Sequence, residues 1–140
     1  MLKQKLLHPE LLSGLARAGH GSQILIADGN YPFVSGSPNL AQKVFLNLTP
    51  GKLTVTDVLD AISESIPIEK ATVMVPDDLS DQPIFKEFKK LLPKALELTK
   101  EKRFDFYNQA KQNDTILVIA TGEQRTWSNL LLTVGVVHAN

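Results

Sequence analysis

Apolar residues along this chain fall into short continuous runs that alternate with segments of helical spacing. Together with one stretch of strict alternation, these runs predict five strands over residues 24–27, 43–48, 71–75, 115–120 and 130–137. Helical spacing predicts four helices: one from Pro9, one from Thr54 or Thr56 to about Ser65, one over 83–98 and one over 102–112. Pro93 must kink or restart the third helix, because proline has no backbone N–H to donate.

The order of these elements predicts the fold class. Helices alternate with strands, and several of the strands are apolar throughout, as strands covered on both faces are. We therefore expect an α/β fold, a single three-layer domain over residues 1–140 with a central, mostly parallel or mixed sheet covered by helices. A chain of 140 residues, 43% of them hydrophobic, can bury the core that such a domain needs.

Composition narrows the classes of function. Fifteen basic and fifteen acidic residues cancel, whereas nucleic-acid-binding proteins carry a basic excess, so we expect no nucleic-acid partner. The chain has no cysteine, which excludes disulfides, thiolate nucleophiles and cysteine-based zinc sites and fits a cytoplasmic protein. No apolar run approaches the ~20 residues that cross a bilayer, and no signal-peptide pattern is present, so we expect no membrane partner.

Candidate chemistry lies on both sides of the first predicted strand. His20 stands between Gly19 and Gly21 after the first helix, and Asp28 follows the end of the strand. Imidazoles exchange protons near neutral pH and carboxylates assist them, so both residues are candidates for acid–base catalysis. A straight strand would hold them apart, so they can meet only if the chain turns after Gly21. The structural alternatives are that His20 caps the first helix and that Asp28 builds a turn.

A second polar block follows the 115–120 strand and contains the only tryptophan. Open α/β sheets bind ligands outside the carboxyl ends of their strands, which is where Asp28 and this block fall. The face of Trp127 suits stacking on a sugar ring, and the Asn129 amide can both donate to and accept from neighbouring hydroxyls. Glu123 can orient an arginine, either Arg125 or Arg103. No glycine-rich phosphate loop is present, which argues against nucleotide binding, and two further histidines far apart make no metal motif.

In combination, these blocks resemble the ribose pyranase / fucose mutarotase family, and they lean toward its fucose mutarotase branch. The resemblance extends from near residue 6 to near residue 137, and the order and spacing of the blocks make it specific. The matching stretches are Pro9 to Leu12, Gly19-His20-Gly21, Asp28 with Tyr31-Pro32, Arg103-Phe104 with Phe106-Tyr107, Thr121-Gly122-Glu123, Asn129 to Leu132, and Gly135-Val136.

The resemblance implies a cytoplasmic enzyme that interconverts the ring or anomeric forms of a monosaccharide without a cofactor or metal. It also implies a ring-shaped homo-oligomer with active sites near subunit contacts. The family's acid–base histidine falls on His20 and its sugar-binding aspartate on Asp28. The further substrate-binding residues that we expect are Arg103, Tyr107, Glu123, Trp127, Ser128 and Asn129.

The chain departs from the family at Trp127, where a tyrosine is usual. Indole has no hydroxyl, so stacking is retained but hydrogen bonding or proton transfer by a tyrosine is lost. This departure leaves open an alternative function, a non-catalytic monosaccharide-binding or regulatory protein of sugar uptake. A nucleotide-binding α/β regulator is a third interpretation that rests on fold analogy alone.

Overall fold

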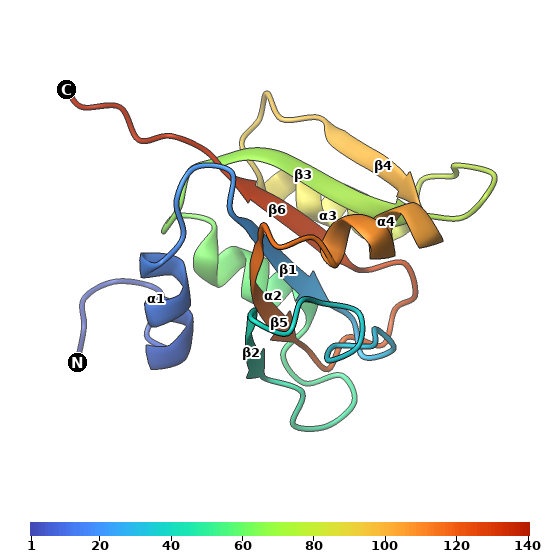
Figure 1. The fold of residues 1–140 in the computed structure, drawn as a ribbon, viewed down its shortest axis with the longest axis horizontal. Coiled ribbons are helices and arrows are strands. Elements are labelled where there is room, and N and C mark those ends of the chain that lie inside the picture. The colour runs from blue at the N-terminus through green and yellow to red at the C-terminus, as the bar shows by residue number, and fades with distance from the viewer.

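The apolar runs form a single six-stranded sheet in a computed structural model that describes residues 1–140. The strands are β1 (Gln23–Ala27), β2 (Gln42–Phe45), β3 (Ile68–Val75), β4 (Leu98–Lys102), β5 (Thr115–Ala120) and β6 (Leu130–Val134). Their order is β2-β5-β1-β6-β3-β4, and every neighbouring pair is parallel except the two that β6 makes with β1 and β3 (Figure 1). The sheet is therefore mixed.

Helices cover both faces of this sheet and produce three layers. They are α1 (Pro9–Ala16), α2 (Val55–Ile62), α3 (Pro83–Leu91) and α4 (Arg103–Ala110). The first three contribute to the larger core cluster, in which Leu11, Leu59 and Phe88 pack against alternate strand residues. In Figure 1, α2 and α3 lie behind the sheet and α4 lies in front of it. The smaller cluster under α4 is centred on Phe106 and includes Tyr31 from the loop after β1.

Local chemistry explains where the helices begin. Pro9 occupies the first turn of α1, and the His8 ring accepts a hydrogen bond from the Leu11 N–H at 3.4 Å. Thr54, rather than Thr56, caps α2: its hydroxyl accepts from the Asp57 N–H, and the Asp57 carboxylate accepts from the Thr54 N–H. Both helix starts therefore agree with the prediction from the sequence, which gives Pro9 for α1 and Thr54 or Thr56 for α2.

The prediction of a helix over residues 83–98 is wrong in its second half. Helix α3 ends at Leu91, two residues before Pro93, and Leu98–Lys102 forms the edge strand β4 instead of continuing a helix. Proline breaks the helix rather than kinking it, and the segment after it pairs in parallel with β3. Strands β2 and β6 are also shorter than their predicted ranges, and no helix in the protein has the length and apolar character to cross a membrane.

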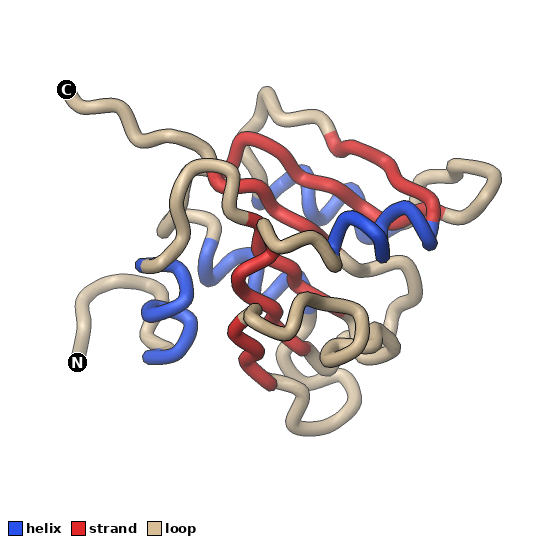
Figure 2. Tube along the Cα trace, viewed as in Figure 1, coloured by secondary structure: helices blue, strands red, loops and turns tan.

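Long loops gather at the end of the sheet where β1, β2 and β5 finish (Figure 2). They connect β1 to β2, β2 to α2, and β5 to β6. The last of these, residues 121–129, is called the 121–129 loop below. Because five strands run in one direction, this edge presents five carboxyl ends together with the beginning of β6. This is the edge where open α/β sheets hold ligands.

Candidate active site

A cavity of about 220 Å³ opens between this edge of the sheet and α4. Its lining residues are Asp28, Asn30, Tyr31, Met74, Arg103, Tyr107, Thr126, Trp127 and Asn129. We call it the Asp28 pocket. Five of the eight residues that the sequence nominates line it, and they come from the end of β1, from α4 and from the 121–129 loop. A carboxylate, a guanidinium and an amide face an apolar wall of aromatic rings, an arrangement that suits a small polyhydroxylated ligand.

Asp28 is the most buried charged group of the pocket, with 3% of its surface exposed. Its carboxylate accepts hydrogen bonds from the Asn30 N–H at 3.0 Å and the Ser128 N–H at 3.4 Å. Burial raises the pKa of Asp28 above its ordinary value, although the backbone N–H bonds oppose the shift. The carboxyl is thus held in place by backbone hydrogen bonds but is poorly solvated. A ligand hydroxyl can donate to it where water is excluded.

Asn129 and Ser128 fix the geometry around Asp28 in different ways. The Asn129 amide oxygen accepts the Asp28 backbone N–H at 2.8 Å, which ties the start of β6 to the end of β1. Its amide NH₂ has no partner within the protein and lines the pocket. Ser128 is fully buried and acts through its backbone N–H, whereas its hydroxyl bonds locally to the Thr126 carbonyl. Ser128 therefore positions the aspartate and does not line the pocket.

The opposite wall is built from stacked aromatic and cationic groups. The Tyr31 ring meets the Tyr107 ring edge-on, with centroids 5.3 Å apart, and the Tyr31 hydroxyl donates to the Gly36 carbonyl at 2.7 Å. The Arg103 guanidinium lies 5.5 Å from the Tyr107 ring centroid and donates to its hydroxyl at 3.4 Å. Burial raises the pKa of Tyr31, so that hydroxyl stays protonated. Arg103 and Tyr107 are brought to the site as the sequence predicts.

Trp127 closes the pocket and adopts an unusual backbone conformation. Its φ is 61°, in the left-handed region that bulky residues rarely adopt. The indole is half-buried and packs against the smaller core cluster. It also lines a second cavity of about 470 Å³ beside Lys102 and Phe104, and Trp127 and Arg103 are the two residues common to both cavities. A strained conformation at a pocket wall is a common feature of functional sites.

Glu123 is buried, and its carboxylate bonds to other groups of the protein instead of lining the Asp28 pocket. Arg125 grips both of its oxygens, at 2.9 and 2.8 Å, and the Val55 N–H at the start of α2 donates to one of them at 3.3 Å. Burial alone would raise the pKa of Glu123, but the hydrogen bonds and charge of Arg125 outweigh it and hold the pKa below its ordinary value. Of the two arginines that the sequence offers as its partner, the structure selects Arg125.

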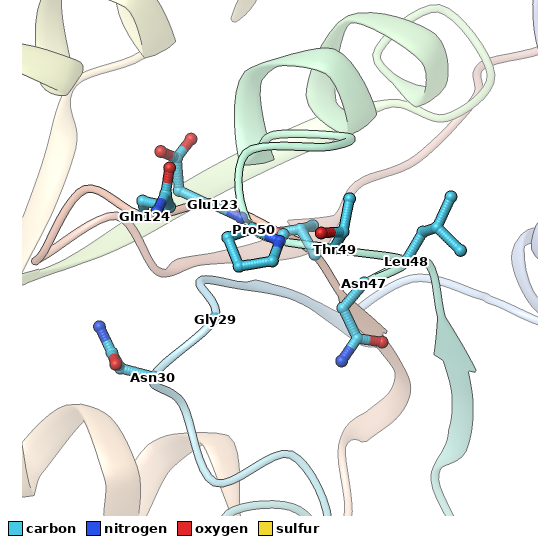
Figure 3. A pocket seen from close by; sticks show the side chains of 10 residues that line it. Gly29, Asn30, Asn47, Leu48, Thr49, Pro50, Glu123 and Gln124 are labelled. Atoms are coloured by element: carbon cyan, nitrogen blue, oxygen red, sulfur yellow. Dashed lines mark hydrogen bonds between the residues drawn. The ribbon is translucent and has the colours of Figure 1, made fainter.

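A neighbouring cavity of about 430 Å³ lies on the other side of Gly29 and Asn30 and is lined mainly by polar residues. In Figure 3, Asn30 and Asn47 lie on one side of it, while the Glu123 carboxylate points away from them toward α2. Glu123 lines this cavity and not the Asp28 pocket. With its carboxylate bonded to Arg125 and Val55, Glu123 offers no free oxygen to the Asp28 pocket, and its role in substrate binding stays a prediction.

His20 lies at the opposite end of the sheet from Asp28. The Gly21 N–H donates to the Val134 carbonyl, which places the Gly19–Gly21 turn beside the end of β6. The five residues of β1 separate the two sites by about 16 Å along the strand. The turn that would bring His20 to Asp28 within one chain does not form. Gly21 has a positive φ of 85°, but this turn leads the chain into β1 and not back along it.

The exposed His20 ring pairs with Glu69 at the start of β3. Its Nε2 lies 3.0 and 3.2 Å from the two carboxylate oxygens, so the imidazole does not cap α1. Sequence reasoning missed Glu69, because residues 49 apart meet only through the register that pairs Ile68 with Val134. A carboxylate fixes the tautomer and orientation of an imidazole, as an acid–base histidine requires. Elsewhere, no three His, Asp or Glu side chains gather in a metal-binding arrangement.

Comparisons with known proteins agree with this geometry. Residues 1–137 match the model of the RbsD / FucU transport protein family. The human fucose mutarotase is 34% identical over 96% of this chain and 92% of its own length, and the D-ribose pyranase of Bacillus cytotoxicus is 30% identical over 98% and 99%. The structure of Bacillus subtilis RbsD complexed with D-ribose superposes with a TM-score of 0.84 at 28% identity, covering 99% of this chain and all of that one. The chain therefore belongs to the RbsD / FucU family.

Proposed function

We propose that the protein interconverts the anomeric or ring forms of a monosaccharide, as a fucose-type mutarotase or a ribose-type pyranase. The observation that carries the proposal is the Asp28 pocket, which combines a buried carboxylate, Arg103 and Asn129 with a half-buried indole. Relatives named for these two activities span almost the whole chain. The chain's lack of cysteine supports a cytoplasmic location, which stays a prediction.

Ring opening needs only two proton transfers, and reclosure needs the same two in reverse. The anomeric hydroxyl loses its proton while the ring oxygen gains one, and the bond between the anomeric carbon and the ring oxygen breaks to give an open-chain aldehyde. Rotation presents the other carbonyl face, and reclosure reverses both transfers. Closure through a different hydroxyl exchanges a pyranose for a furanose. Protons taken and given are equal in number, so the substrate and product differ only in ring form.

We propose that His20 exchanges these protons and that Glu69 positions it. No histidine lines the Asp28 pocket, and His20 lies exposed at the far end of the sheet. The pocket of one chain is therefore completed by His20 of a second copy. This arrangement requires a homo-oligomer in which the His20 end of one subunit meets the Asp28 end of another. A ring-shaped assembly satisfies that requirement at every subunit.

The remaining residues bind the sugar. Asp28 accepts hydrogen bonds from sugar hydroxyls, the Arg103 guanidinium donates to them, and the free NH₂ of Asn129 donates from the sheet side. Tyr107 holds Arg103 in place through the contact between its ring and the guanidinium. Trp127 covers the apolar face of the sugar ring but has no hydroxyl with which to transfer a proton.

The experiment that tests this function is exchange NMR on the anomeric signals of L-fucose, D-ribose and D-galactose. We expect the protein to accelerate exchange for at least one sugar, and we expect His20→Ala to reduce that acceleration by about 10²-fold or more. The matched control is His138→Ala, which removes an exposed imidazole from the C-terminal segment. Unchanged exchange in a folded His20→Ala protein would refute the role of His20.

The indole in place of a tyrosine favours a second candidate function, a non-catalytic monosaccharide-binding or regulatory protein of sugar uptake. The same experiment separates the two. Line broadening or chemical-shift changes of the sugar without faster exchange would select the binding protein. Faster exchange that depends on His20 would select the enzyme.

A further inference from the structure

The 121–129 loop is tied down firmly at both ends. At its start, the Thr121 hydroxyl donates to the Ala27 carbonyl at 2.7 Å, and the Glu123 carbonyl accepts the Gly29 N–H at 2.9 Å. At its end, Ser128 and Asn129 bond to Asp28. The stretch from Gln124 to Trp127 lies between these attachments and contains the pocket wall.

Within that stretch, Arg125 carries the hydrogen bonds to another element. Its Nε and Nη2 bind both oxygens of Glu123, and its Nη1 donates to the Glu87 carboxylate on α3 at 2.8 Å. Glu123 has only 3% of its surface exposed and also accepts the Val55 N–H of α2. The three charged residues thus fasten the middle of the loop to the face of the sheet that α2 and α3 cover. We call Arg125, Glu123 and Glu87 the loop clamp.

The clamp and the pocket wall lie on opposite sides of the same loop. Arg125 reaches toward α3, whereas Trp127, two residues later, packs on the α4 side against the smaller core cluster that includes Phe106. The loop therefore straddles the end of the sheet. Trp127 keeps its positive φ only while the chain on both sides is held, because a bulky residue left free would relax to a more favourable backbone conformation.

We propose that Arg125, held by Glu123 and Glu87, is a positioning residue for sugar binding, because it fixes Trp127 as the wall of the Asp28 pocket. Resting as it does on the proposed function, this role concerns affinity and not proton transfer. Trp127 and Arg103 are the two residues that line both the Asp28 pocket and the 470 Å³ cavity beside it. A displaced indole opens the pocket on that side and removes the surface against which a single sugar ring stacks.

The first test uses the free protein. Trp127 is the only tryptophan, so its fluorescence reports on this position alone. We expect Arg125→Ala to shift the emission to longer wavelength and to increase quenching by acrylamide, since the indole becomes more exposed. Glu87→Gln should change both readings in the same direction by a smaller amount, and Arg125→Lys should restore part of the wild-type signal, because lysine keeps the charge but not the two-point grip.

The second test measures the dissociation constant for L-fucose or D-ribose, whichever the wild-type protein binds. Arg125→Ala should weaken binding by about tenfold, the effect of losing one charge-assisted anchor. The exchange rate at saturating sugar should stay within about twofold of wild type, because the acid–base groups are untouched. The matched control is Lys5→Ala, which breaks an ion pair with Asp60 of α2. Its side-chain exposures of 41% and 49% resemble the 41% and 45% of Arg125 and Glu87.

Wild-type emission, quenching and sugar affinity in a folded Arg125→Ala protein would overturn the positioning role. If Arg125→Ala does not fold, Glu87→Gln leaves Arg125 on Glu123, and unchanged readings in that variant would overturn it instead. A wild-type protein that binds none of the sugars would refute the proposed function. Emission and quenching of the free variants would still decide whether the clamp positions Trp127.

Discussion

At the scale of single residues, Asp28 shows how burial and hydrogen bonding compete at one carboxyl group. Desolvation raises its pKa and outweighs the backbone N–H groups of Asn30 and Ser128 that favour the charged form. The folded protein therefore binds a proton at Asp28 more tightly than the unfolded chain does. A site that presents a carboxylate to sugar hydroxyls keeps that group at a cost in stability.

This competition predicts how stability depends on pH. Between the ordinary value of 3.8 and the raised pKa, the folded state holds a proton that the unfolded state has lost. The contribution of Asp28 to stability is thus fully present below 3.8 and is lost as the pH rises through the raised pKa. We expect the free energy of unfolding of wild type, measured relative to Asp28→Asn by urea denaturation, to fall as the pH rises from the ordinary value of 3.8 through the raised pKa.

Asp81 provides the opposite control, because the hydrogen bond and charge of Lys100 lower its pKa. Its contribution is present above the ordinary value and is lost as the pH falls through the lowered pKa, so the difference between wild type and Asp81→Asn should decrease on acidification. A wild-type advantage over Asp28→Asn that grows with pH would show that hydrogen bonding, and not burial, dominates at Asp28.

Single residues also show what the sequence can predict of the site. Asp28, Arg103, Tyr107, Trp127 and Asn129 do converge, because each lies next to a strand end or a helix start that periodicity locates. The structural use of Glu123 is not predictable, since it depends on the Val55 N–H of a separate helix. The contact between Glu69 and His20 depends on strand register, which no local pattern encodes.

At the scale of elements, β4 is a strand that local sequence patterns do not predict. Its residues Leu-Thr-Lys-Glu-Lys are mostly polar and lack a buried face, so no alternation marks them as a strand. β4 is an edge strand that pairs with β3 alone, and edge strands with charged side chains resist further pairing. The strand Thr115–Ala120, in contrast, is predicted to the residue, because both of its faces are covered.

Gly122 packs against the β2–α2 loop so closely that no side chain fits there. A Cβ at this position would lie 2.6 Å from the Thr49 carbonyl oxygen and closer still to that of Lys52, both of them backbone atoms that move only if the chain moves with them. We expect Gly122→Ala to lower the free energy of unfolding by about 2 kcal/mol, because the β2–α2 loop must shift. Gly19→Ala is the control: nothing lies within 4 Å of its added methyl group, so its stability in urea should match wild type. Equal stability of the two variants would show that the loop yields freely.

At the scale of the whole molecule, the direction of the sheet governs where the chemistry can occur. The Asp28 pocket lies at the carboxyl ends of the parallel strands, and the His20–Glu69 pair lies at their amino ends. Under the proposed function, one subunit carries two incomplete halves of the site, and we therefore propose that catalysis requires a second copy of the chain. The sequence predicts the strand that holds His20 and Asp28 apart, but only the fold shows that no turn after Gly21 brings them together and that Glu69 lies beside His20.

Two inactive variants should consequently complement each other. Neither His20→Ala nor Asp28→Asn should accelerate anomer exchange alone. In co-expressed mixed oligomers, about a quarter of the pockets would combine an intact Asp28 with an intact His20 from the neighbour, and exchange should recover in proportion.

Asp28→Asn mixed with Arg103→Ala is the control, because both residues belong to the pocket of one chain and every pocket keeps one defect. Recovery in the first mixture alone would establish a site shared between subunits. Equal recovery in both would mean that Asp28 and Arg103 act in different sites, and recovery in neither would return His20 to a role within its own chain.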